Sequence, residues 1–214
     1  MCNLYSLTKG QAAIVALVRA MRDRTGNMPP LPGIFPDMSA PVVRTGEDGT
    51  REMLMMRWGF PPPPNMRAEL VTNVRSTKSG FWRKWLNAEN RCLVPATSFA
   101  EWTGTRPKTT HWFALSEERP LFFFAGIWRS WTGPRGPKKN PVEGQHLLYS
   151  ILTTQANDLV RPIHAQAMPV ILTTPEECET WMNAPMDEAL TLQRPLANDA
   201  LKIVATGEKE DKAA

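Results

Sequence analysis

The sequence holds few of the residues that metal sites and disulfide frameworks need. Its 214 residues contain three Cys and three His, and neither type recurs at the short spacing of a metal-binding motif. The three cysteines, Cys2, Cys92 and Cys178, are odd in number and widely separated, which argues against disulfide pairing and fits a reducing compartment. We therefore expect no metal site.

Long hydrophobic runs are also missing, and the first residues do not resemble a secretory leader. We expect a cytoplasmic protein with no membrane partner. No glycine-rich phosphate loop is present, so no cofactor is expected, and a Ser-His-Asp hydrolase has no nucleophile-elbow sequence to rest on.

The composition that remains is ordinary for a globular chain, with 42% hydrophobic and 21% charged residues. Tyrosine is scarce, with two residues against eight Trp, whereas Pro is frequent with twenty. That balance favours many short strands and turns over long helices. The net charge of +4 suits an anionic partner such as nucleic acid, although so small an excess is equally compatible with simple solubility.

Hydrophobic patterning predicts mainly strands. A helix over residues 8–22, capped by Thr8, would bury Ile14, Leu17, Val18 and Met21, and Phe81, Trp82, Trp85 and Leu86 indicate a second, short one. Thr174-Pro175-Glu176-Glu177 is a capping box that starts a helix to about Asn183, with another near 185–190. The expected strands are 41–43, 52–58, 91–99, 111–115, 121–128, 147–153 and 201–205.

These elements predict one compact α+β domain over residues 1–207, with a strand-rich, barrel-like mixed β core and a few flanking helices. Residues 208–214 are expected to form a solvated tail. Residues 131–144 contain three Gly, three Pro and three basic residues, and they predict a long mobile loop between two strands.

The second residue carries the most specific chemistry. If Met1 is trimmed, Cys2 becomes an N-terminal residue with a free α-amine beside its thiol. Both groups titrate close enough to neutrality to act as nucleophiles. An aldehyde can condense with the amine to an imine, and the thiol can then close a five-membered thiazolidine ring intramolecularly. The alternative is that Cys2 is an ordinary residue tucked under a strand.

Other polar residues lie in apolar or turn-bounded stretches, each with a structural alternative. Glu101 precedes Trp102 at a strand end, where apolar surroundings would raise its pKa for proton transfer; it could equally bond a loop amide. His164 precedes an apolar run and is by itself more typical of a structural residue. Asn73 and Arg75 share a polar segment, and Arg75 could hold a phosphate or form a surface ion pair. The Trp side chains could stack on bases or fill the core.

Taken in order, these segments resemble the SRAP family, the SOS-response-associated peptidases that are also described as abasic-site processing proteins. The resemblance covers Met1 to about Leu172. The matching segments are Met1-Cys2, Arg57-Trp58-Gly59-Phe60-Pro61, Asn73-Val74-Arg75-Ser76, Arg91-Cys92-Leu93-Val94-Pro95 with Phe99-Ala100-Glu101-Trp102, Phe124-Ala125-Gly126-Ile127-Trp128, Ile151-Leu152-Thr153-Thr154-Gln155-Ala156-Asn157, and Ile163-His164 with Met168-Pro169-Val170.

The resemblance implies a sensor of abasic sites in single-stranded DNA. We expect the protein to be a monomer. Cys2 would form a thiazolidine crosslink with the ring-opened sugar, which shields the lesion and could reverse itself. Glu101 and His164 would handle proton transfers, and Asn73 would position the Cys2 end. Arg75 would hold a flanking phosphate, while Trp58, Gly59 and Trp102 would contribute to the DNA-binding surface.

The sequence departs from the family pattern in three places. Asn3-Leu4 replaces the usual Gly-Arg, the Asn of an Asn-x-x-Pro turn is missing near Gly33 to Pro36, and Ala167 stands where an Arg is usual. These changes concern DNA affinity rather than the chemistry of Cys2. Two other functions use the same residues: an N-terminal-nucleophile cysteine amidohydrolase or peptidase, and a non-covalent single-strand binder with an inert Cys2.

Overall fold

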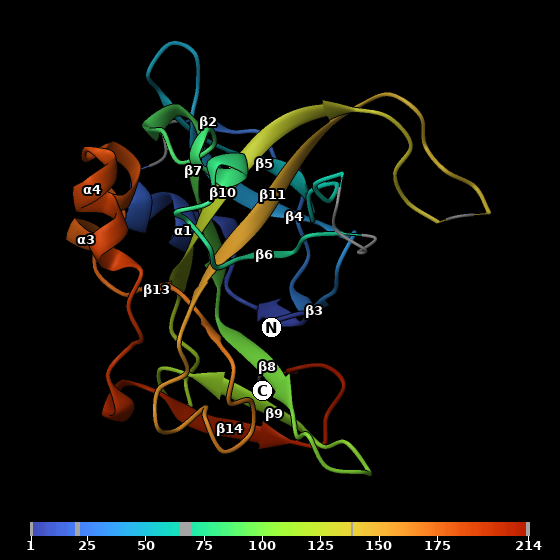
Figure 1. Cartoon of the computed structure of the whole chain (residues 1–214), viewed down its shortest axis with the longest axis vertical. Coiled ribbons are helices and arrows are strands. Elements are labelled where there is room, and N and C mark those ends of the chain that lie inside the picture. The colour runs from blue at the N-terminus through green and yellow to red at the C-terminus, as the bar shows by residue number, and fades with distance from the viewer. Residues whose placement is uncertain (1, 20–21, 65–69, 138, 213–214) are drawn as a thin grey trace.

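Five strands of the computed structural model close into a barrel, seen in the upper half of Figure 1. The structure describes residues 2–19, 22–64, 70–137 and 139–212. The barrel strands are β4 (Ser39–Thr45), β5 (Arg51–Trp58), β7 (Arg91–Ala96), β10 (Phe122–Thr132) and β11 (Gln145–Thr154). Four antiparallel contacts run in the order β11-β10-β7-β4-β5, and a parallel contact between β5 and β11 closes the ring. The expected barrel-like mixed core is confirmed.

A second sheet lies below the barrel in Figure 1. Its order is β14 (Lys202–Thr206), β9 (Thr110–Ala114), β8 (Ser98–Trp102), β1 (Tyr5–Leu7) and β3 (Leu31–Ile34). The single strand expected over 91–99 is therefore two strands in different sheets. The chain changes sheets at Thr97, whose backbone N–H donates to the Ser6 carbonyl at 2.8 Å.

Four two-residue strands attach to the barrel. β2 (Arg22–Asp23) pairs with β5, and β6 (Asn73–Val74) runs parallel to β11. β12 (Met168–Pro169) pairs with β11, and β13 (Ile171–Leu172) pairs with β10. The end of β11 thus lies next to both β6 and β12, which brings the segment of Asn73 close to the segment that follows His164.

The helices are short. They are α1 (Gln11–Val18), α2 (Gly80–Arg83), α3 (Pro175–Asn183) and α4 (Met186–Ala189), with 3-10 turns η1 (Ala88–Asn90), η2 (Leu190–Leu192) and η3 (Asn198–Ala200). The capping box is confirmed, because Thr174 accepts a hydrogen bond from the Glu177 backbone N–H. Helix α3 covers the barrel, where the Trp181 indole donates to the Cys92 and Gly126 carbonyls.

The first helix differs from its prediction. It starts after Gly10 and not at Thr8, because the Thr8 hydroxyl and backbone N–H both bond the hydroxyl of Thr97. It ends at Val18, where Arg19 takes a left-handed conformation. Ile14 and Val18 are buried as expected, whereas Leu17 is exposed. Met21 lies outside the described residues.

Two segments expected to be loose are held in place. Residues 131–137 and 139–144 continue from β10 and β11 in an extension that projects from the barrel (Figure 1), and Arg135 exchanges backbone hydrogen bonds with Val142. The 208–214 segment is exposed at Glu208, Lys209 and Glu210, but Asp211 is 2% exposed. The prediction of a solvated tail is wrong at this residue, because Asp211 bonds Ser98 and Arg119.

Among the described residues, no helix is long and apolar enough to span a membrane.

Candidate active site

Cys2 lies three residues before the start of β1 and is fully buried. Strand β1 pairs antiparallel with β8, so that Tyr5 faces Phe99 and Ser6 faces Ser98. The Ala100 N–H continues this pairing by donating to the Leu4 carbonyl at 2.9 Å. The next pair in this register is Asn3 with Glu101. Antiparallel pairing therefore brings the start of the chain to Glu101.

Asn73 holds the backbone of Cys2. Its Nδ2 donates to the Cys2 carbonyl at 2.8 Å and to the Thr72 hydroxyl at 2.8 Å. That hydroxyl in turn donates to Oδ1 of Asn3 at 2.9 Å. Asn73 in β6 thus fixes the position of Cys2, and Thr72, directly before β6, fixes that of Asn3. Within the described part of the chain, Asn73 Oδ1 is buried and accepts no hydrogen bond. This placement agrees with the positioning role that the resemblance implied for Asn73.

Glu101 has the electrostatic character of a proton-transfer group. Its side chain is 1% exposed, and burial raises the pKa of Glu101 to about 7. The carboxyl therefore exchanges its proton near neutrality. Burial, and then the negative charge of Glu101, raise the pKa of the Cys2 thiol far above its ordinary value. The charge of Glu101 thus acts on the thiol of Cys2.

His164 is held in a turn between β11 and β12. Its ring Nδ1 lies 3.0 Å from the Ala167 carbonyl, which can only accept a hydrogen bond, so Nδ1 carries the proton in this contact. The basic nitrogen of the neutral ring is then Nε2. Burial lowers the pKa of His164 below its ordinary value.

Arg75 is exposed and extends from the segment that carries Asn73. Its guanidinium donates to the Gln166 carbonyl, two residues beyond His164. Arg75 also borders a polar cavity of about 410 Å³ with Thr153, Thr154, Gln155, Gln193, Arg194 and Pro195. An exposed guanidinium in a polar recess can hold a phosphate oxygen.

Trp58 and Gly59 are not accessible for direct contact with a base in this structure. Trp58 is fully buried between Tyr5 and Tyr149, and its indole donates to the Thr72 carbonyl at 3.0 Å. Gly59 is buried too, and its carbonyl accepts a hydrogen bond from Arg135 at 2.8 Å. Both are covered by protein in this structure, and their contribution to a DNA-binding surface stays a prediction. Trp102 is half-buried against Leu4 and Trp112.

Leu4 explains the departure at the start of the sequence. Its side chain is buried with Ala100 and Trp112. The position where the family has Arg therefore contributes to the hydrophobic core of the second sheet in this chain and offers no cation to DNA.

Two residues of the site were not predicted from the sequence. Thr72 bonds Asn3, and Gln193 joins the segment of Arg75 to the end of β11. Neither belongs to a motif, and both act through nonlocal contacts that only the fold creates. Among the described residues, no group of three or more His, Cys, Asp or Glu side chains is arranged to hold a metal ion.

A family comparison fits this geometry. The model of the family described as SOS response associated peptidase (SRAP) matches residues 1–209. The chain belongs to the SRAP family. The resemblance inferred from the sequence motifs is thus confirmed over almost the full length of this SRAP chain.

The chain is also similar to characterised relatives. It is 38% identical over 149 residues to the abasic site processing protein YoqW of Bacillus subtilis, a match that covers 64% of this chain and 60% of YoqW. It is 35% identical over 151 residues to YobE of the same organism, also named an abasic site processing protein, covering 64% of this chain and 61% of YobE. The matched region spans about three-fifths of each relative.

Solved structures show the same fold. A protein from Bacteroides thetaiotaomicron superposes with a TM-score of 0.73 at 22% identity, covering 94% of this chain and 90% of that chain. A protein from Bordetella bronchiseptica superposes with a TM-score of 0.72 at 22% identity, covering 96% and 98%. At this level of identity the likeness concerns the fold alone.

Proposed function

We propose that this SRAP chain captures abasic sites in single-stranded DNA as a covalent adduct of Cys2. The names of its relatives support abasic-site processing. The observation that carries the proposal is the placement of Cys2, whose carbonyl is held by Asn73 and whose segment pairs toward the buried carboxyl of Glu101.

The chemistry needs a free α-amine, so Met1 must first be removed. The amine of Cys2 then adds to the aldehyde carbon of the ring-opened sugar, and loss of water gives an imine. The thiol next adds across the C=N bond: sulfur bonds the former aldehyde carbon, and a proton reaches the nitrogen. The product is a thiazolidine, with no net oxidation or reduction.

The surrounding residues suit these steps. Forming the imine requires one proton to reach the departing oxygen and others to leave nitrogen. Glu101, with a pKa of about 7, can give and take a proton at neutral pH. His164, with Nδ1 held by Ala167, presents Nε2 as a second base. Reversal would use the same groups in the opposite order, and Arg75 would hold a neighbouring phosphate.

An amidohydrolase based on Cys2 receives less support. Such an enzyme uses a thiolate nucleophile. In this structure the thiol of Cys2 points to the Leu4 carbonyl at 3.6 Å, and its raised pKa keeps it protonated at neutral pH. A protonated thiol can still close a ring when a nearby base accepts its proton.

A denaturing-gel assay tests the proposal. Purified protein, with Met1 removal established by intact mass, is mixed with a single-stranded oligonucleotide that holds one abasic site. We expect a heat-stable shifted band with the wild type and none with Cys2→Ala or with undamaged DNA. Cys2→Ser should give at most a weaker, labile adduct, because a hydroxyl closes the ring less readily.

Cys178→Ala is the matched control, since Cys178 is also a buried free thiol but belongs to helix α3. It should leave the band unchanged. If the wild type gives no band although its mass shows that Met1 is gone, covalent capture is wrong, and amide substrates become the next class to test.

A further inference from the structure

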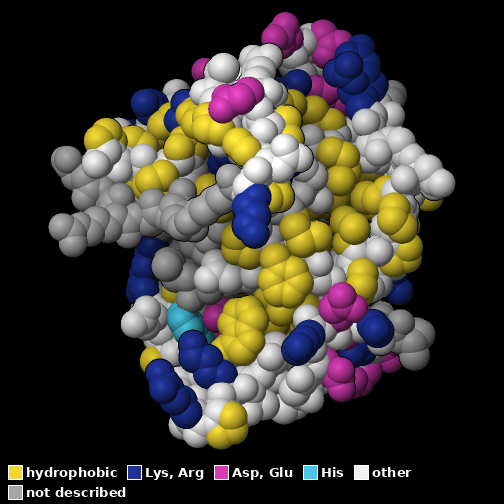
Figure 2. Space-filling view, turned by 90° about the vertical axis from the view of Figure 1, so that its right-hand side faces the viewer, with side chains coloured by type: hydrophobic (Ala, Val, Ile, Leu, Met, Phe, Trp, Pro, Cys, Tyr) yellow, Lys and Arg dark blue, Asp and Glu magenta, His cyan; other side chains and the backbone are white. Residues whose placement is uncertain are grey.

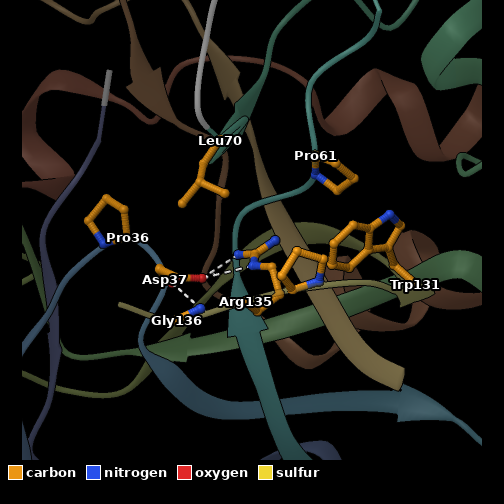
Figure 3. Close-up of a pocket in the computed structure, with 8 residues that line it drawn as sticks. Pro36, Asp37, Pro61, Leu70, Trp131, Arg135 and Gly136 are labelled. Carbon is orange, nitrogen blue, oxygen red and sulfur yellow. Dashed lines mark hydrogen bonds and ion pairs between the residues drawn. The ribbon is translucent and has the colours of Figure 1, made fainter. Parts of the chain in front are cut away.

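A cavity of about 630 Å³ opens between the extension of β10 and β11 and the body of the protein (Figure 3). Its lining is Pro36, Asp37, Pro61, Leu70, Trp131, Pro134, Arg135 and Gly136. Most of these side chains are apolar rings or branches. The volume falls in the range of sites that bind small organic groups.

The Asp37 carboxylate of this cavity is paired with two guanidinium groups, those of Arg135 and of Arg57, whose Nη1 lies 3.6 Å from Asp37 Oδ2. Arg135 donates through Nε and Nη2 to Asp37 at 2.9 and 2.5 Å, and the Gly136 N–H donates to the same carboxylate at 3.0 Å. Figure 3 shows the ion pair between the Asp37 carboxylate and the Arg135 guanidinium at the cavity wall. The charged groups of the wall are thus engaged with one another, and the apolar rings of the lining are the surface that the cavity offers to a flat group.

Trp131 offers a fixed stacking surface at this cavity. Its ring is half-buried and stacks on the cross-strand His146, with 6.3 Å between ring centroids and 28° between planes. Gly133 allows the ring to lie close to the backbone, since a Cβ there would come within 2.4 Å of the indole. The indole is thus held in place before any ligand arrives.

Hydrogen bonds connect the cavity to the residues that hold Cys2. Arg135 donates to the Gly59 carbonyl, and the Asp37 N–H donates to the Trp58 carbonyl at 2.8 Å. The Trp58 indole bonds the carbonyl of Thr72, whose hydroxyl bonds Asn3. The buried Trp58-Gly59 segment therefore lies between the cavity on one side and the start of the chain on the other.

We propose that this cavity binds one unpaired nucleobase of the strand whose abasic site is held at Cys2, with the base stacked on Trp131. The inference rests on the proposed function, because only a single strand that occupies the Cys2 site would place a neighbouring base here. Stacking on an aromatic side chain tolerates any base, which suits lesions that arise in any sequence. Figure 2 shows a face on which hydrophobic and basic side chains adjoin, as single-strand binding requires.

The test removes the base and the ring separately. Capture rates are measured at limiting protein for two kinds of oligonucleotide, each with one abasic site. In the first kind the neighbouring nucleotides are normal. In the second kind one neighbouring nucleotide, either upstream or downstream of the abasic site, is replaced by an unreactive tetrahydrofuran spacer. For one position the spacer should slow wild-type capture about tenfold, as expected for the loss of one base stack. Trp131→Ala should be equally slow with both oligonucleotides.

Trp131→Phe keeps a smaller ring and should retain much of the dependence on the base. The matched control is Trp128→Ala, which removes a half-buried indole from the same strand but does not line the cavity. It should keep the full wild-type dependence. Thermal unfolding verifies that each variant is folded.

Three results would overturn the inference. The first is a wild-type capture rate that the spacer does not change at any position. The second is a capture rate of Trp131→Ala that still depends on the neighbouring base, and the third is a capture rate of Trp128→Ala that no longer depends on it. These differ from a failure of the proposed function, in which the wild type forms no adduct with any oligonucleotide. In that case the inference falls with the function on which it rests.

Discussion

At the scale of single residues, Glu101 couples function to a cost in stability. A carboxyl whose pKa rises from 4.5 to about 7 on folding binds its proton more tightly in the folded chain. Its contribution to the free energy of unfolding is therefore fully favourable below pH 4.5 and is lost as the pH rises to about 7. A residue retained at such a cost is typical of a functional site.

We predict that Glu101→Gln stabilises the protein at pH 8 by as much as about 3 kcal/mol and hardly at all at pH 4. The same variant should capture abasic DNA at least about 100-fold more slowly, since a general acid–base group is lost. Urea unfolding at both pH values and the capture rate measure the two effects.

Glu52→Gln is the control, because Glu52 is buried but paired with Arg24 and Arg44. It should destabilise the protein at pH 8 by leaving Arg44 without its anion. A loss of stability in Glu101→Gln at pH 8 would contradict the assignment of a raised pKa.

Asn73 is predicted to act through its donor group and not through its size. Asn73→Asp keeps the shape but places a carboxylate oxygen against the Cys2 carbonyl, where Nδ2 now donates. We expect a loss of about 1–3 kcal/mol in unfolding free energy and capture slowed at least about tenfold. Urea unfolding and the gel assay measure both, and capture at the wild-type rate would exclude the positioning role.

At the scale of elements, Gln193 ties the segment of Arg75 to the barrel. Its Nε2 donates to the carbonyls of Arg75 and Thr153 at 2.8 and 2.9 Å, and its Oε1 accepts from the Thr77 hydroxyl at 2.8 Å. One side chain that follows turn η2 thus joins β11 to the segment after β6. The position of Arg75 depends on these contacts.

We predict that Gln193→Ala and Arg75→Ala weaken single-strand binding in different ways. Arg75→Ala should lower the salt slope of log affinity by about 0.7, the value for one phosphate contact. Gln193→Ala should lower affinity by roughly five- to tenfold without changing the slope, because no charge is lost. Gln193→Glu keeps the acceptor for Thr77, loses both donors and adds a negative charge to the recess of Arg75, so it should lower the affinity more than Gln193→Ala does.

Fluorescence anisotropy from about 50 to 300 mM salt gives both quantities for each variant. A smaller salt slope in Gln193→Ala would mean that Gln193 affects the number of phosphate contacts and does more than position Arg75.

Local signals made some elements predictable. Helix α3 follows directly from Thr174-Pro175-Glu176-Glu177, whose capping contacts lie within one turn. The candidate residues Cys2, Asn73 and Glu101 came from motif order, and the fold places their segments together. Thr8 was assigned to the wrong role because its partner Thr97 is distant in sequence. Trp58 could not be recognised as buried, since its neighbours Tyr5 in β1 and Tyr149 in β11 are both distant from it in the sequence.

At the scale of the whole molecule, the last residues fasten the second sheet. The Asp211 carboxylate accepts from Ser98 at 2.5 Å and from Arg119 at 2.9 Å, and its N–H donates to the Pro32 carbonyl at 2.9 Å. Ser98 begins β8, the strand that carries Glu101. A residue near the C-terminal end therefore supports the sheet to which Cys2 is attached.

We predict that Asp211→Ala lowers the free energy of unfolding by about 3 kcal/mol, or roughly 5–10 °C in Tm, because Arg119 is left buried without its anion. The control Glu210→Ala removes an exposed carboxylate whose contact with Lys212 is 3.7 Å long, and it should change Tm by about 1 °C or less. Thermal unfolding of both variants decides whether this segment is a solvated tail or part of the fold.

The parallel contact between β5 and β11 also has a consequence for the order of events during synthesis. Trp58 pairs with Tyr149 and Asn73 with Ile151, so neither the closed barrel nor the contacts around Cys2 can form until most of the chain has been made. Such nonlocal pairings form late. Under the proposed mechanism, an aminopeptidase has its best access to Met1 while the nascent N-terminus is still unfolded, since closure of the barrel buries Cys2 completely. Under that mechanism we therefore expect Met1 to be removed during translation, before the barrel closes.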